Sequence, residues 1–192
     1  MIKDLLAIYG SPRKDGNTDI LLSHFVKGAK EAGLNVDEVF LRNLNLSYCR
    51  ECRACDKTGL CVIKDDMHLL YPKFSQTHAI VIAAPIFFYN VPALTKMMID
   101  RVQCLWAKKY ILKEKISNLE FERKGIFLSL GATKGEKLFE GTKLTIKYFF
   151  DAIDIKYFDD FFIRKVDNKG EINKYPDLLQ VVYDKGLDIL SN

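Results

Sequence analysis

The sequence predicts a doubly wound α/β fold with a five-stranded parallel sheet, and three observations support this. First, short apolar stretches alternate with amphipathic stretches five times along the 192 residues. Second, residues 79–86 are apolar throughout, as a central parallel strand covered on both faces must be. Third, no Ser/Gly/Pro-rich linker and no repeat divides the chain. We therefore expect a single domain over residues 1–192.

Each expected strand is a short apolar run that ends at a turn, and each expected helix carries apolar residues three or four positions apart. Gly10 ends the first strand and Gly33 ends the first helix, while Asp65 and Asp66 open a short helix. The strands are expected at residues 2–9, 36–41, 79–86, 125–130 and 155–166. The other helices are expected at residues 20–33, 94–106, 136–152 and 176–190.

Five strands favour the flavodoxin-like strand order 2-1-3-4-5 over the six-stranded dinucleotide-binding fold. Right-handed crossovers then bring every strand-to-helix loop to one edge of the sheet. Ligands of such sheets bind where the strand order reverses, which here is between the first and third strands. The loops at residues 10–18 and 85–92 are therefore the first places to look for a binding site.

Composition and charge exclude several classes of protein. The longest apolar run, residues 79–88, contains Pro85 and is far shorter than the roughly 20 residues that span a bilayer. Residues 5–9 are too short for a signal-peptide core, so we expect a cytoplasmic protein without a membrane segment. The net charge of +4 comes entirely from residues 101–124 and lacks the density of a nucleic-acid-binding stripe. We expect no nucleic-acid partner.

The loop at residues 10–18 predicts a phosphate site. It has neither a Walker sequence nor the Gly-x-Gly-x-x-Gly spacing, which argues against ATP hydrolysis and against the usual dinucleotide fingerprint. It does bring hydrogen-bond donors to the start of a helix, where free backbone N–H groups and the helix dipole favour an anion. These donors are Ser11, Arg13, Asn17 and Thr18. The alternative is an ordinary loop in which Asn17 or Thr18 caps the helix.

The loop at residues 85–92 predicts a site for a flat ligand. Three aromatic residues, Phe87, Phe88 and Tyr89, follow the central strand, where exposure to water would waste their apolar area. Backbone amides of such a loop can hydrogen-bond the edge of an isoalloxazine ring. The alternative is that the aromatic side chains pack on a neighbouring helix or a second subunit. A third loop, with Gly131, follows the fourth strand and reaches the same edge.

Four of the five cysteines lie within thirteen residues in a C-x2-C-x2-C-x5-C arrangement. A reducing compartment favours metal binding or thiol chemistry over disulfides. Three thiolates at two-residue intervals can each bind a different iron of a [4Fe–4S] cubane, and a fourth can complete the set. Zinc fits this spacing less well, and free or redox-active thiols are a further alternative. The four candidate ligands are Cys49, Cys52, Cys55 and Cys61, in a loop over residues 48–62 that we expect beside the phosphate loop.

With these segments together, the chain resembles the iron–sulfur flavoproteins of the NADPH-dependent FMN reductase family, which are related to flavodoxin and to WrbA-type quinone reductases. The resemblance rests on residues 10–18, on the cysteine segment with residues 62–67, and on residues 84–92 with Lys96 and Asp100-Arg101. It implies FMN, with its phosphate at Ser11, Arg13, Asn17 and Thr18. It also implies a [4Fe–4S] cluster on the four cysteines. The implied ring-binding residues are Pro85, Ile86, Phe87, Phe88, Tyr89 and Asn90.

The resemblance further implies a homo-oligomer, a dimer or tetramer, and a redox partner such as ferredoxin or NAD(P)H. We expect an FMN-dependent oxidoreductase that relays electrons between such a donor, the cluster, FMN and a terminal acceptor, without a catalytic side chain. One alternative is a cluster-free NAD(P)H:FMN or quinone reductase. Others are a non-enzymatic electron carrier that docks through residues 101–124, and a zinc-stabilised interaction module.

Overall fold

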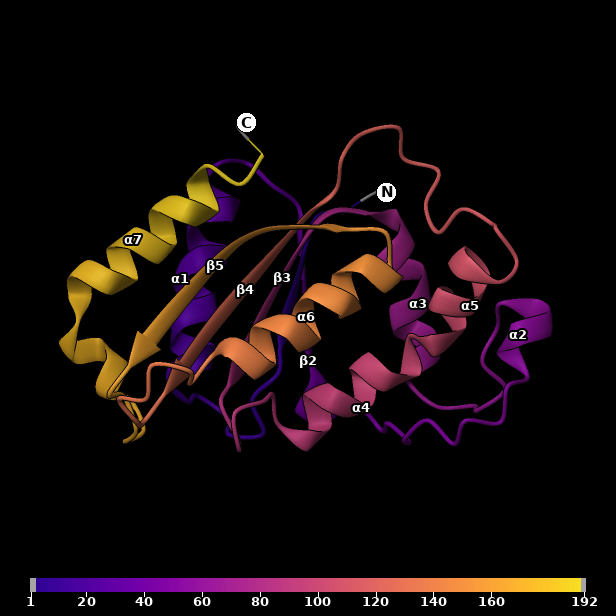
Figure 1. The fold of residues 1–192 in the computed structure, drawn as a ribbon. Helices are drawn as coiled ribbons and strands as arrows, with labels where there is room; N and C mark the ends of the chain where they lie inside the picture. Colours follow the sequence, from indigo (N-terminus) through magenta and orange to yellow (C-terminus); the bar gives the residue numbers. More distant parts are fainter. Residues whose placement is uncertain (1–2, 191–192) are drawn as a thin grey trace.

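The computed structural model describes residues 3–190, which form one five-stranded parallel sheet in the order β2-β1-β3-β4-β5 (Figure 1). The flavodoxin-like order predicted from the sequence is therefore confirmed. All four pairs of neighbouring strands are parallel, with one irregularity of register between Gly125 and Ile126. The strands are β1 (Lys3–Tyr9), β2 (Val36–Phe40), β3 (Thr77–Pro85), β4 (Lys124–Gly131) and β5 (Lys156–Arg164).

The helices follow the predicted alternation, with two differences. A four-residue helix, α2, lies within the cysteine segment, where no helix is expected from the sequence. The single helix expected at residues 94–106 is divided into α4 and α5 at Val102. The helices are α1 (Asn17–Glu31), α2 (Cys55–Thr58), α3 (Met67–Gln76), α4 (Ala93–Arg101), α5 (Gln103–Tyr110), α6 (Glu140–Ala152) and α7 (Pro176–Leu187), with 3₁₀ turns at Leu41–Asn43 and Glu171–Lys174.

The break between α4 and α5 has a tertiary cause. In an unbroken helix the Leu105 N–H would donate to the Arg101 carbonyl, four residues back. It donates instead to the Val102 carbonyl at 2.8 Å, while the Arg101 carbonyl accepts the Tyr71 hydroxyl of α3 at 3.1 Å. The Tyr71 hydroxyl thus takes the place of the backbone N–H that would bind the Arg101 carbonyl in a continuous helix.

The sheet separates two apolar cores, as Figure 1 shows with α1 and α7 on one face and α3, α4 and α6 on the other. Successive residues of β1 point to opposite faces, so Leu5 and Ala7 pack in one core and Leu6 and Ile8 in the other. Both faces of β3 are buried, which explains why its sequence is apolar at consecutive positions.

Helices α1 and α7 approach each other closely where each carries a glycine. A Cβ atom at Gly28 would lie 2.1 Å from the Tyr183 carbonyl oxygen, and one at Gly186 would lie 2.1 Å from the Phe25 carbonyl oxygen. Any larger side chain would force the two helices apart. Among residues 3–190, no helix is long and apolar enough to cross a lipid bilayer.

Candidate functional site

A cavity of about 350 Å³ lies at the carboxyl ends of the strands, within the size range of small-molecule sites. We call it the strand-edge cavity. It is formed by the loops that follow β1, β3, β4 and β5, and so it lies at the predicted switch point between β1 and β3. Its lining residues are Ser11, Pro12, Arg13, Gly16, Asn17, Thr18, Pro85, Ile86, Phe87, Leu130, Gly131, Ala132, Val166 and Asp167.

The loop after β1 brings backbone and side-chain donors to this cavity. The Ser11 hydroxyl accepts the Arg13 N–H at 3.1 Å, which makes the chain turn toward the start of α1. Among the described residues, no side chain caps the N-terminus of α1, and Gly16 occupies the cap position. Thr18 is buried, yet its hydroxyl has no hydrogen-bond partner within residues 3–190. The first turn of α1 thus retains free donors, as an anion site requires.

Asn17 also lines the cavity, but its side-chain amide already has two partners. It donates to the Asn168 carbonyl at 2.8 Å and accepts the Ile172 N–H at 3.3 Å. Asn17 therefore holds the loop after β5 against the loop after β1. The loop after β5 contributes Val166 and Asp167 to the lining, which the sequence analysis missed although a fifth parallel strand must end at the same edge.

Arg42 supports the loop after β1 from behind. Its guanidinium donates to the Ser11 carbonyl at 3.3 Å and forms an ion pair with Asp19 at 2.9 Å. Burial raises the pKa of the Asp19 carboxyl, and the hydrogen bond and charge of Arg42 oppose that shift. Arg42 thereby neutralises the negative charge of Asp19, which lies in the first turn of α1 close to the cavity.

The aromatic loop after β3 lies only partly in the cavity. Phe87 and Asn90 exchange backbone hydrogen bonds of 2.8 and 3.1 Å, and the two residues between them have left-handed backbone, with φ of 49° at Phe88 and 61° at Tyr89. This is the geometry of a turn that usually carries asparagine and glycine. It directs Phe88 into solvent, where the side chain is 102% exposed, so Phe88, Tyr89 and Asn90 lie outside the cavity lining.

A second cavity, of about 450 Å³, is lined by all four clustered cysteines, and we call it the cysteine cavity. We expected the cysteines beside the phosphate loop, but the segment packs against α5 instead, and the two cavities share no lining residue. Figure 1 shows α2 beyond α5, on the side of the molecule opposite α7. Cys104, which we expected to stand alone, also lines this cavity because the break after α4 redirects α5.

The cysteine segment has an irregular backbone. Glu51 and Arg53 adopt left-handed φ values of 52° and 56°, a costly conformation for side-chain-bearing residues that recurs at functional sites. Among the described residues, no three His, Cys, Asp or Glu side chains are arranged to hold a metal ion. Burial raises the pKa of the Cys55 thiol, and the nearby Asp56 carboxylate adds to the effect. Burial also raises the pKa of Cys104 to about 11.

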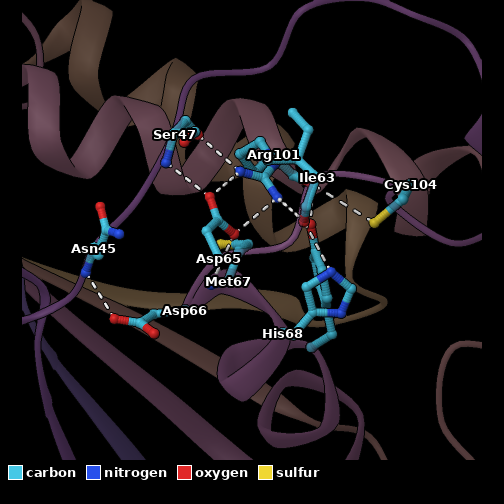
Figure 2. Close-up of polar contacts among 10 residues, drawn as sticks. Asn45, Ser47, Ile63, Asp65, Asp66, Met67, His68, Arg101 and Cys104 are labelled. Atoms are coloured by element: carbon cyan, nitrogen blue, oxygen red, sulfur yellow. Dashed lines mark hydrogen bonds and ion pairs between the residues drawn. The ribbon is translucent and has the colours of Figure 1, made fainter.

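A group of polar contacts closes the base of the cysteine segment, and Figure 2 shows them. We call this group the neck. The Asp65 carboxylate accepts the Ser47 N–H at 2.7 Å and the Met67 N–H at 3.1 Å, so it joins the two arms that precede and follow the cysteines. Asp66 repeats the link one residue further along by accepting the Asn45 N–H at 2.7 Å.

Arg101, the last residue of α4, occupies the centre of the neck (Figure 2). Its two terminal nitrogens contact the Asp65 carboxylate at 2.5 and 3.0 Å, and they also donate to the Ser47 carbonyl at 2.8 Å and the Ile63 carbonyl at 3.3 Å. Burial alone would raise the pKa of Asp65. The hydrogen bonds from Arg101 and from two backbone N–H groups outweigh burial, so the pKa of Asp65 lies below its ordinary value. The ion pair is therefore fully charged at neutral pH.

Comparison with known proteins identifies relatives of the chain. The model of the NADPH-dependent FMN reductase family matches residues 4–134. An iron-sulfur flavoprotein of Methanosarcina thermophila is 35% identical over 130 residues, which cover 68% of this chain but only 64% of that protein's own length. An iron-sulfur flavoprotein of Clostridioides difficile is 25% identical over 191 residues, which cover 94% of this chain and 85% of that protein.

Solved structures share the fold. The NAD(P)H:quinone oxidoreductase from Methanothermobacter marburgensis superposes with a TM-score of 0.74 at 16% sequence identity, over 99% of this chain and 97% of that one. At this identity the likeness shows the architecture alone. It agrees with the five-stranded order of the sheet.

Proposed function

The chain belongs to the NADPH-dependent FMN reductase family, and from this premise we propose that it is an FMN-dependent oxidoreductase whose flavin occupies the strand-edge cavity. The observation that carries the proposal is the uncapped N-terminus of α1, which opens into that cavity next to Thr18, a largely buried residue whose hydroxyl has no hydrogen-bond partner among the described residues. A phosphate monoester is the part of FMN that such donors bind.

The chain's own residues divide the work of binding FMN. The first turn of α1, Thr18 and Arg13 bind the phosphate, while Ser11 shapes the turn that presents them. Pro85, Ile86 and Phe87 line the part of the cavity toward the ring. Gly131 also lines the cavity, and a Cβ atom there would lie 2.9 Å from the Leu138 side chain, so a larger residue would have to displace Leu138. Bound FMN would supply the redox chemistry.

We further propose that Cys49, Cys52, Cys55 and Cys61 hold a [4Fe–4S] cluster. Four thiols of one segment line one cavity, their spacing suits a cubane, and two relatives carry the name iron-sulfur flavoprotein. Arg50, Arg53 and Arg101 line the same cavity, and their charge suits an anionic cluster. Such a cluster would relay single electrons. The lack of a ready metal-holding group among residues 3–190 favours one alternative, a cluster-free NAD(P)H-dependent flavin or quinone reductase.

The electron donor we propose is NAD(P)H, as the family's description suggests, with a ferredoxin-like protein as the alternative. We also propose a homo-oligomer. Phe88 and Tyr89 next to the strand-edge cavity are exposed, and so are Tyr48, Leu60 and Val62 in the cysteine segment. A second copy of the chain would cover such apolar surface. Light scattering that finds a monomer with all cofactors bound would contradict this proposal.

The decisive experiment is anaerobic purification followed by an absorption spectrum and by flavin, iron and sulfide assays. We expect one FMN, about four iron and about four acid-labile sulfide per chain. Cys52→Ser should lose the iron and keep FMN, since the two cavities share no lining residue. Cys104→Ser is the matched control and should keep both. Full flavin with no iron would support the cluster-free reductase, and stoichiometric zinc without flavin would overturn the proposal.

A further inference from the structure

Arg101 is the buried cation of the cysteine cavity. The residue is 1% exposed, whereas Arg50 and Arg53, which line the same cavity, belong to the exposed part of the cysteine segment. Asp65, the counterion of Arg101, is not among the residues that line the cavity. Of the two residues of this buried ion pair, Arg101 lines the cysteine cavity and Asp65 does not.

One donor of this guanidinium is left over. The two terminal nitrogens of Arg101 have four hydrogen-bond contacts, all to the neck. The third nitrogen, Nε, is buried and has no hydrogen-bond partner among the described residues. Buried donors without partners are rare and costly in folded proteins. Arg101 therefore retains a buried, unpaired donor and a full positive charge in the wall of the cysteine cavity.

The neck also determines where the cysteine segment begins and ends. Arg101 contacts the carbonyl of Ser47, two residues before the first cysteine, and the carbonyl of Ile63, two residues after the last. One side chain at the end of α4 therefore fixes both arms of the segment. The carbonyl of Arg101 also accepts the thiol of Cys104 at 3.6 Å, which ties the start of α5 to the same point.

We propose that Arg101 is a positioning residue for the iron–sulfur site: it fixes both arms of the cysteine segment and places its buried positive charge beside the sulfur atoms of a cluster. The inference rests on the proposed cluster and adds the residue that would tune it. Outer contacts of this kind orient the metal ligands and adjust the redox potential of the metal group. A buried positive charge favours the reduced, more negative form of a cluster and so raises its potential.

The test uses the full-length protein, reconstituted anaerobically with iron and sulfide, and compares Arg101→Gln with Arg101→Lys. Arg101→Gln should make the iron about 10- to 100-fold easier to remove with a chelator, the usual effect of losing an outer contact of a metal site. The clusters that remain should have a more negative midpoint potential, followed by electron paramagnetic resonance during redox titration. Arg101→Lys keeps the charge and should restore the potential toward the wild-type value, although it cannot contact both arms.

Lys57→Gln is the matched control, since it removes a positive charge from the cysteine segment at an exposed position outside the cavity lining. It should leave iron retention and potential close to wild type. FMN content reports folding in each variant. Should Arg101→Gln fail to fold, Arg101→Lys still tests the inference, because iron held as firmly as in the wild type by a side chain that cannot contact both arms would overturn it.

Three outcomes separate the possibilities. Wild-type retention and potential in Arg101→Gln would overturn the inference while leaving the cluster in place. Loss of iron with an unchanged potential in both Arg101 variants would reduce Arg101 to a structural residue and also overturn it. Wild-type protein that takes up FMN but no iron would overturn the proposed cluster itself, and with it this inference.

Discussion

Thr18 offers a direct test of the proposed FMN site, because it lines the strand-edge cavity and its hydroxyl has no hydrogen-bond partner among the described residues. Thr18→Val removes the hydroxyl and keeps the shape of the side chain. A hydrogen bond to a charged phosphate contributes about 1.5–3 kcal/mol, and each 1.4 kcal/mol corresponds to a tenfold change in Kd. We therefore expect the Kd for FMN to rise by about 10- to 100-fold. The free energy of unfolding of the flavin-free chain should change by less than about 0.5 kcal/mol, since no internal contact is lost.

The assay is the quenching of flavin fluorescence, measured with FMN and with riboflavin, which has the same ring but no phosphate. Thr18→Val should weaken the binding of FMN and leave the binding of riboflavin unchanged. Arg13→Ala should weaken FMN binding by about 0.5–1 kcal/mol more. This effect should shrink at high ionic strength, because Arg13 is exposed. Lys14→Ala is the matched control, since Lys14 is an exposed cation of the same loop outside the cavity lining. Equal weakening of FMN and riboflavin by Thr18→Val would refute the assignment of the phosphate to this loop.

Three further predictions concern stability. Gly186→Ala should lower the free energy of unfolding in urea by about 1–3 kcal/mol, because its Cβ atom would overlap the Phe25 carbonyl oxygen; an unchanged transition would contradict the close contact of α1 and α7. Lys113→Gly should stabilise the chain by about 0.5–1 kcal/mol, since it relieves left-handed backbone at an exposed side chain, and a loss of stability would show that the Lys113 side chain packs on a neighbouring residue. Asp65→Asn should destabilise the chain by about 3–5 kcal/mol at neutral pH. The lowered pKa of Asp65 means that this difference is present above its ordinary value of 3.8 and disappears as the pH falls through the lowered pKa; a difference that persists in acid would contradict the ion pair.

The parts of the fold that depend on local sequence could be predicted. Apolar runs that are buried on both faces, such as residues 79–86, identify the strands, and chirality then restricts the strand order. The same reasoning located the loops of the strand-edge cavity, because parallel strands must end at one edge. This reasoning could not distinguish hydrogen-bond donors that are free to contact a ligand from donors that already bind other parts of the chain. Asn17 and Thr18 are adjacent and both polar, yet the Asn17 amide is bound to a loop about 150 residues away in the sequence.

The path of the cysteine segment could not be predicted, because it depends on contacts between residues far apart in the sequence. Residues 44–66 have neither helical nor alternating periodicity, so the sequence indicates no direction for the segment. The direction comes from Asp65 and Arg101, which are separated by 36 residues, and from the Tyr71 hydroxyl that ends α4. Arginine and aspartate are usually exposed, so a buried pair of this kind gives no signal in composition or periodicity.

Helix α4 connects the two cavities. It begins at Ala93, directly after the aromatic loop of the strand-edge cavity, and ends at Arg101 in the neck of the cysteine segment. Figure 1 shows how it runs toward α5. At a rise of 1.5 Å per residue, its ends are about 12 Å apart along the axis. A helix is stiff over such a length, and Arg101 fixes both arms of the cysteine segment. The number of residues between Pro92 and Arg101 therefore determines how far the cysteines lie from the proposed flavin site of the same chain, whereas the spacing of the cysteines determines only which metal group they could hold.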